Sequence, residues 1–284
     1  MAKIEMFART EVGCIRKRNE DSFVVADLAN RSRGIWPEQR VREVTNGGIL
    51  LSVCDGMGGA AAGDVASGLA VDALYNTLID HAPFPSTEVL QQGLLAAVTS
   101  ANKSIYDFAS QDPTRHGMGT TMTAGVVYGP ELGIVHVGDS RAYLVRAQAL
   151  TQLTTDHSIV GQLIAAGRMT REQARSFEQR NVLLQALGVQ PRVGPELVNL
   201  MLCDGDLLLF CSDGLTGPLP EELLLDHLLA HHDPVQICRV LTEAASAAGG
   251  PDNVTAVVAR VSGRDLRKPV PGEPVRLDRS QASA

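Results

Sequence analysis

The chain has 284 residues, of which 44% are hydrophobic but only 4% aromatic, so its core is expected to be built from aliphatic side chains. Its formal net charge is −7 and it has no long run of Lys and Arg, which excludes nucleic-acid binding through a basic face. The first residues lack a signal-peptide pattern, and the longest apolar runs fall short of the roughly 20 residues that span a bilayer, so no membrane anchor is predicted.

The first third of the chain shows three strand-like segments, at residues 7–15, 22–28 and 48–54. The last of these is nearly all apolar, as in a strand that is buried on both faces. Between the last two segments, residues 29–46 are polar, rich in arginine and include the only tryptophan, Trp36. We interpret this stretch as a solvated hairpin excursion, and contact with a substrate is the alternative left open.

Helical spacing of apolar residues marks 60–80 and 86–110 as two long helices. Strand and helix signals then alternate over the rest of the chain. We expect strands at 120–128, 133–137, 142–146, 206–211 and 254–261, and helices at 220–230 and 234–248. This order of elements predicts two sheets covered by helices, which is an α+β layered domain.

Two segments depart from this order. Residues 156–188 have a helical pattern of mixed polarity, rich in Arg, Gln and Glu. We expect a flap-like insertion over a site there, and we call residues 156–188 the flap. Residues 263–284 carry three prolines and alternating charges, which predicts a disordered tail.

The five cysteines form no CxxC pair, are odd in number and mostly lie in apolar runs. They are Cys14, Cys54, Cys203, Cys211 and Cys238. This pattern predicts buried, reduced thiols in a cytoplasmic protein.

Acidic residues recur beside the strands, often next to glycine. They are Glu20, Asp21, Asp55, Asp139, Asp213 and Asp252. A single Asp-Gly pair usually marks only a turn. Five acidic clusters at strand ends of one domain would repel each other unless cations lay among them, and an oxygen-only ligand set favours Mg²⁺ or Mn²⁺ over zinc.

Six motifs in fixed order carry a family resemblance. They are RKRNEDS at 16–22, VCDGMGG at 53–59, GMGTT at 117–121, HVGDSR at 136–141, LLFCSDGL at 208–215 and DNVT at 252–255. With them the chain resembles the metal-dependent, type 2C serine/threonine protein phosphatases, in their bacterial branch. The resemblance extends from about residue 7 to 261, and it implies that one phosphatase domain fills residues 1–262.

The resemblance also implies the architecture and the site. The fold would be a four-layer α-β-β-α sandwich of two antiparallel sheets flanked by helices, with a metal cleft at one edge. The cofactors would be two core ions, Mn²⁺ or Mg²⁺, with a third ion held by Asp139. The ligands of the core ions would be Asp55 between both ions, Glu20 and the Gly56 carbonyl on one, and Asp213 and Asp252 on the other. Asp21 and Asn253 would orient ligands or waters, and Arg16 would bind the substrate phosphate.

The implied activity is hydrolysis of phosphoserine and phosphothreonine in proteins by a water between the metal ions. The implied partners are phosphorylated proteins and a cognate bacterial Ser/Thr kinase that the enzyme opposes, and the chain is expected to be a monomer. A catalytically silent phosphoprotein-binding module is one alternative, and an enzyme acting on a small phosphoester is another. Retention of Arg16, Asp55, Asp213 and Asp252 argues against the silent module.

One position departs from the family. Eukaryotic members often carry a histidine after the Asp-Gly pair, where this chain has Met57, as bacterial members do. The group that protonates the leaving oxygen therefore stays open. His157 is one candidate acid, and a structural or capping role is the interpretation favoured for it.

Overall fold

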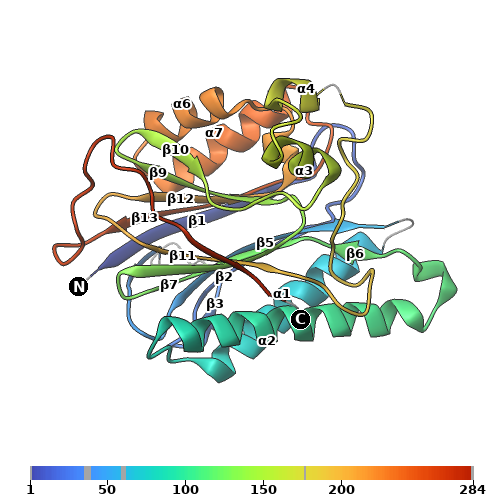
Figure 1. Cartoon of the computed structure of the whole chain (residues 1–284), viewed down its shortest axis with the longest axis horizontal. Coiled ribbons are helices and arrows are strands. Elements are labelled where there is room, and N and C mark those ends of the chain that lie inside the picture. Colours follow the sequence, from blue (N-terminus) through green and yellow to red (C-terminus); the bar gives the residue numbers. More distant parts are fainter. Residues whose placement is uncertain (1, 35–39, 59–61, 176, 283–284) are drawn as a thin grey trace.

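The computed structural model describes residues 2–34, 40–58, 62–175 and 177–282. Its strands form two antiparallel sheets that stack face to face, with helices on each outer face (Figure 1). The four-layer α-β-β-α sandwich predicted from the sequence is therefore confirmed. None of the helices in these ranges has an apolar stretch long enough to cross a lipid bilayer.

The two sheets contain six and eight strands. The six-stranded sheet has the order β10-β9-β12-β13-β1-β4, with bounds Ala149–Gln152, Arg141–Arg146, Leu207–Cys211, Val254–Ser262, Lys3–Glu11 and Val41–Glu43. The larger sheet runs β14-β11-β8-β7-β5-β2-β3, with bounds Asp278–Gln281, Glu196–Met201, Glu131–Val137, Met122–Tyr128, Ile49–Met57, Asp21–Asp27 and Ser32–Arg33. Its eighth strand, β6 (Gly119–Thr120), pairs with the end of β5.

The helices fall into three groups. They are α1 (Gly63–His81) and α2 (Thr87–Ser110) on the larger sheet; α5 (Asp213–Thr216), α6 (Glu221–Ala230) and α7 (Pro234–Ala247) on the smaller one; and α3 (Ile159–Ala165) and α4 (Arg171–Arg175) in the flap. A 3₁₀ turn, Pro113–Arg115, follows α2. Ser86 caps α2 by accepting a hydrogen bond from the Val89 amide, so the predicted start at residue 86 is the cap itself.

Three apolar layers hold the sandwich together: one under α1 and α2, one between the sheets, and one under α6 and α7. Strand β5 shows how its sequence serves two of them. Leu51 and Val53 face the layer between the sheets, whereas Leu50 and Cys54 face the helices. The nearly all-apolar sequence of β5 is therefore that of a central strand buried on both faces, as predicted.

The tail does not have the predicted disorder. Residues 278–281 form strand β14, which pairs with β11 along the edge of the larger sheet, and Leu266 is buried in the layer between the sheets. An edge strand needs mainly backbone partners, and all four β14 residues are exposed, so no apolar pattern announces it. The three prolines and the low apolar content of residues 263–284 therefore led to a wrong prediction of disorder.

Three other predictions need correction. Among the described residues of the flap, only α3 and α4 are helical, and residues 177–188 are irregular. Cys14 is exposed, although the other four cysteines are buried and all five are free. In the 29–46 stretch, β3 and β4 extend the two sheets at separate edges, whereas Trp36 lies outside the described residues.

Candidate active site

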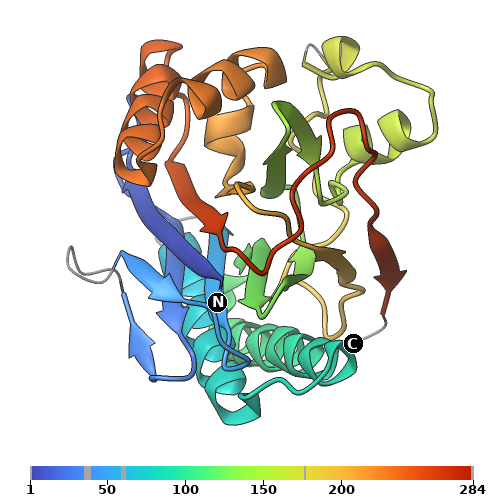
Figure 2. The same ribbon diagram turned by 90° about the vertical axis from the view of Figure 1, so that its left-hand side faces the viewer.

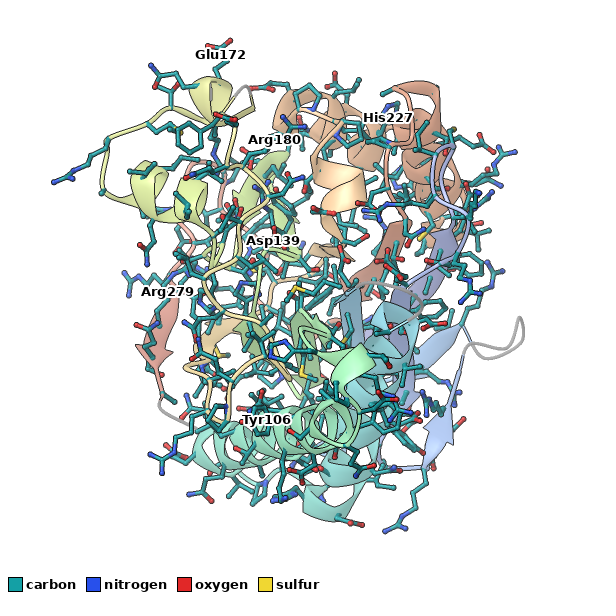
Figure 3. The ribbon with its side chains drawn as sticks, turned by 90° about the vertical axis from the view of Figure 1, so that its right-hand side faces the viewer. Tyr106, Asp139, Glu172, Arg180, His227 and Arg279 are labelled. Carbon is teal, nitrogen blue, oxygen red and sulfur yellow. The ribbon has the colours of Figure 1, made fainter. Side chains whose placement is uncertain are left out.

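Five aspartates gather where strands of both sheets end. Asp21 begins β2 and Asp55 lies near the end of β5 in the larger sheet, whereas Asp213 follows β12 and Asp252 precedes β13 in the smaller sheet. Asp139 lies on the turn between β8 and β9, near the middle of the face in Figure 3. Burial raises the pKa of Asp55 well above its ordinary value, and the other four carboxylates raise it further. The five predicted aspartates therefore share one site.

The larger sheet brings two of these carboxylates directly opposite each other. Asp21 is the cross-strand partner of Asp55, and like charges in such a pair destabilise a sheet. At the next residue, Gly56, the backbone of Gly63 lies so close that no side chain would fit, because a Cβ there would lie 2.1 Å from the Gly63 carbonyl oxygen. The Gly56 amide donates to the Glu20 carbonyl at 3.1 Å. Glu20 is thereby fixed beside Asp55 and Gly56.

Asp21 joins the two sheets beneath the site. Its Oδ2 accepts hydrogen bonds from Ser212 Oγ at 2.7 Å, directly after β12, and from Thr255 Oγ1 at 2.6 Å, in β13 of the smaller sheet. Its Oδ1 is buried and has no hydrogen-bond partner among the described residues. Burial raises the pKa of Asp21 to about 7, although the two hydroxyl donors lower it. Asp21 thus leaves one buried acceptor oxygen unused beside Asp55.

Asn253 fixes the loop that carries Arg16. Its Oδ1 accepts from the Glu20 amide at 2.8 Å, and its Nδ2 donates to the carbonyls of Val12 and Arg18 at 2.9 and 2.8 Å. On the same side Arg16 Nη2 donates to Asp252 Oδ2 at 2.7 Å. The half-exposed Arg16 guanidinium is therefore held at the rim of the acidic cluster.

The threonines of the GMGTT motif hold the backbone of Asp55. Thr121 Oγ1 accepts from the Asp55 amide at 2.9 Å, and Thr120 Oγ1 donates to the Asp55 carbonyl at 2.8 Å. Thr121 Oγ1 also lies 2.7 Å from Ser140 Oγ, next to Asp139. These contacts tie together the two chain segments that carry Asp55 and Asp139.

The turn that carries Asp139 is anchored by the start of the flap. Burial raises the pKa of Asp139 well above its ordinary value, Asp213 and Asp156 raise it further, and Arg141 lowers it. Arg141 donates to both carboxylate oxygens of Asp156, from Nε at 2.9 and 3.0 Å and from Nη2 at 2.6 Å. Arg141 and Asp156 were not singled out from the sequence. The only signal for Arg141 was its place in the HVGDSR motif, and Asp156 had none.

His157 has a structural role in this anchor. Its Nδ1 accepts from the Gly138 amide at 3.4 Å, and its own amide donates to the Gly138 carbonyl at 2.7 Å. Burial lowers the pKa of His157, which disfavours the protonated ring. Both observations agree with the structural interpretation over the alternative of a general acid.

The donor set fits a hard divalent cation, because every candidate ligand is an oxygen and one buried carboxylate oxygen is unused. The side chains do not form a preassembled cage. Within the described ranges, no three His, Cys, Asp or Glu side chains are placed around a single point where an ion could sit. Instead Asp252 accepts a hydrogen bond from Arg16. Burial raises the pKa of Asp213, Asp252 raises it further, and the contact with Asp55 lowers it.

A cleft of about 1050 Å³ opens from the acidic cluster toward the flap. Arg16, Asp139, Asp213 and Asp252 line its inner end. The flap and the α5–α6 region form its walls, and Figure 3 shows Arg180 of the flap above Asp139. The cleft therefore joins the carboxylates to a surface long enough for an extended ligand.

Comparison with known proteins agrees with this geometry. Residues 36–249 match the family model described as Protein phosphatase 2C. The serine/threonine protein phosphatase PstP of Mycobacterium tuberculosis is 39% identical over 264 residues, which are 93% of this chain and 46% of that protein. This chain thus spans about half the length of PstP. The serine/threonine phosphatase stp of Listeria monocytogenes is 34% identical over 258 residues, which are 91% of this chain and 95% of that protein.

A solved structure of a relative has the same fold as this chain. The catalytic domain of PstP in complex with two manganese ions superimposes with a TM-score of 0.77 at 37% sequence identity, covering 93% of this chain and 100% of that one. The family match covers most of the chain, and stp aligns over nearly its whole length. The chain therefore belongs to the protein phosphatase 2C family, as the six motifs predicted.

Proposed function

We propose that this chain is a metal-dependent protein phosphatase that hydrolyses phosphoserine and phosphothreonine. The observation that carries the proposal is that Asp55, which is only partly exposed, is repelled by four other aspartates beside a cleft of about 1050 Å³. Buried like charges are costly unless cations lie among them. The relatives PstP and stp are both named serine/threonine phosphatases, and the PstP catalytic domain was solved with two manganese ions.

We assign the metal sites to the oxygen ligands expected from the motifs. Two core ions, Mn²⁺ or Mg²⁺, would be held by Asp55 between them, by Glu20 and the Gly56 carbonyl on one side, and by Asp213 and Asp252 on the other, with Asp139 holding a third. When bound, such ions supply an activated water at neutral pH and neutralise charge on the phosphate. Asp21 and Asn253 would act by keeping the ligand loops in place, which their hydrogen bonds support.

Arg16 would bind the phosphate of the substrate. Its guanidinium lines the cleft and is held by Asp252, so it needs little reordering to meet a phosphate entering beside the carboxylates. A guanidinium grips two phosphate oxygens in a planar fork, and it stabilises the charge that develops on them during hydrolysis.

The cleft favours phosphoproteins over small phosphoesters, because its walls extend far beyond the space that one phosphate needs. We further propose that residues 1–262 form a single phosphatase domain, to which the C-terminal segment adds the edge strand β14. We also propose a monomeric enzyme that opposes a Ser/Thr kinase, and a cytoplasmic location, which the five free thiols support. The experiment is to compare phosphoserine and phosphothreonine peptides with glycerol phosphate in the presence of Mn²⁺. Higher kcat/KM on both peptides is expected, and equal or higher kcat/KM on glycerol phosphate would contradict the proposal.

Leaving-group protonation gives a sharper prediction for Asp139. Met57 has no proton to give, and His157 Nδ1 already accepts from Gly138, so we propose that proton delivery depends on Asp139. Nitrophenolate leaves readily without a proton, whereas a threonine alkoxide does not. Asp139→Ala should therefore slow hydrolysis of a phosphothreonine peptide about tenfold more than that of p-nitrophenyl phosphate. Equal losses on the two substrates would show that Asp139 supports the site only in a general way.

A further inference from the structure

The two ends of the flap region meet at one carboxylate. Thr155 immediately precedes the flap, and Glu196 begins strand β11 where the chain returns to the sheet. The Glu196 carboxylate accepts from the Thr155 amide at 2.8 Å and from Thr155 Oγ1 at 3.0 Å. We call Thr155 and Glu196 the neck. The neck closes a loop of about 40 residues, so its hydrogen bonds restrict how the whole flap can move.

The C-terminal strand adds a cation to the neck. Glu196 is only 8% exposed, and a buried carboxylate is costly unless it is paired. Arg279 of β14 places Nη1 2.5 Å from Glu196 Oε1 and 3.2 Å from Thr155 Oγ1. Its backbone partner in β11 is Val198, two residues from Glu196, so the contact is a diagonal one on the same face of the sheet.

The arrangement is visible in two views. Figure 2 shows the C-terminal segment passing beside the flap and ending as β14 along the sheet edge. Figure 3 shows Arg279 on that strand, on the same face of the molecule as Asp139. Arg279, Thr155 and Glu196 also line one open pocket of about 320 Å³, to which β14 contributes Ser280 and Gln281 as well.

The neck is continuous with the anchor of the metal-site turn. Directly after Thr155, Asp156 accepts hydrogen bonds from Arg141. The next residue, His157, forms two hydrogen bonds with Gly138, which precedes Asp139. A shift at the neck would thus be passed to the flap, whereas the Arg141–Asp156 and His157–Gly138 hydrogen bonds hold the Asp139 turn in place. Rigid, hydrogen-bonded contacts of this kind transmit displacement better than a loose loop.

We propose that Arg279 is a positioning residue for the phosphatase site. Through its contacts with Glu196 and Thr155, which we call the lock, the C-terminal strand holds the neck in place and so sets the position of the flap against a protein substrate. The inference rests on the proposed function only for its consequence on substrates. The lock itself is a statement about the flap, and it has a readout that needs no activity.

The kinetic test compares two substrates in the full chain. Arg279→Ala should raise KM for a phosphothreonine peptide about tenfold, because misplacing a positioning element by even an ångström is expensive. kcat on the peptide and kcat/KM on p-nitrophenyl phosphate should stay within about twofold, since the small ester does not need the flap. Arg279→Lys should restore the wild-type KM, because both contacts come from the single nitrogen Nη1, which an ammonium can replace.

The matched control is Arg276→Ala, which removes the same charge from an exposed position three residues earlier. The mobility of the flap is measured by limited trypsin digestion, as the rate of cleavage after Arg168 and Arg180. Arg279→Ala should speed flap cleavage about fivefold, whereas Arg276→Ala and Arg279→Lys should match the wild type. Thr155→Ala provides a second route to the same effect if Arg279→Ala lowers the melting temperature.

Each outcome decides one of the two ideas. Unchanged flap cleavage in Arg279→Ala and Thr155→Ala, or the same change in Arg276→Ala, overturns the lock. A parallel loss on both substrates assigns Arg279 to overall stability and also overturns it. A wild-type chain that ignores phosphothreonine peptides but shows faster flap cleavage in Arg279→Ala would keep the lock and reject the proposed function.

Discussion

Asp213→Asn is expected to lower turnover of a phosphothreonine peptide by about a thousandfold or more, since losing a metal ligand removes several kcal/mol of transition-state stabilisation. Asp213 lies two residues after β12, at the start of α5, and lines the cleft, so its side chain serves the site and not the apolar layers. Asn keeps the volume of the side chain but loses its charge. The measurement is kcat/KM at saturating Mn²⁺.

The protein should stay folded in this variant. Burial and Asp252 both raise the pKa of Asp213, so its ionised form is unfavourable without metal, and Asn removes that cost. The melting temperature of the metal-free variant should thus equal or exceed that of the wild type. Asp226→Asn, at an exposed position on α6, is the matched control and should leave both quantities unchanged. A wild-type rate in Asp213→Asn would break the assignment of this ligand.

Mn²⁺ is expected to stabilise the wild-type chain strongly. A ligand that binds only the folded state contributes about 2.7 kcal/mol at a hundred times its Kd. For a domain of this size, that corresponds to a rise of about 5–10 °C in melting temperature. The physical source is the relief of repulsion among Asp55 and its four neighbouring carboxylates, which is unfavourable in the metal-free fold.

The matched variant for this effect is Asp55→Asn, because Asp55 is the residue repelled by all four others. Its metal-free form should melt higher than the metal-free wild type, and Mn²⁺ should add much less. Differential scanning calorimetry at fixed ionic strength, with and without Mn²⁺, measures both shifts. The same Mn²⁺ shift in Asp55→Asn and wild type would mean that the ion binds elsewhere.

Much of the fold could be predicted because its signals are local. In β5, α1 and α2, the pattern of apolar residues within the segment itself predicts which of its side chains are buried. The carboxylates near the ends of β5 and β12 could be predicted for the same reason, since a strand end next to glycine is a local feature. Recognising them as one site required the order of all six motifs.

The missed parts depend on partners far away in the chain. Strand β11 contains the buried polar residues Glu196 and Asn199, and Glu196 is compensated by Thr155 and by Arg279, which no local pattern shows. Arg141 and Asp156 form a partly buried pair across 15 residues for the same reason. Strand β14 lies on a sheet edge with exposed side chains, so its sequence resembles that of a loop.

The most direct test of the account is phosphate release from a phosphothreonine peptide with Mn²⁺ and with excess chelator. In the proposed chemistry the nucleophile is a water that the bound ions would activate, and not a side chain of the cluster. Hydrolysis should therefore fall to background in chelator and return when Mn²⁺ is restored. Asp213→Asn should stay near background in both conditions. Full activity in chelator, with the protein shown to be free of metal, would contradict the account.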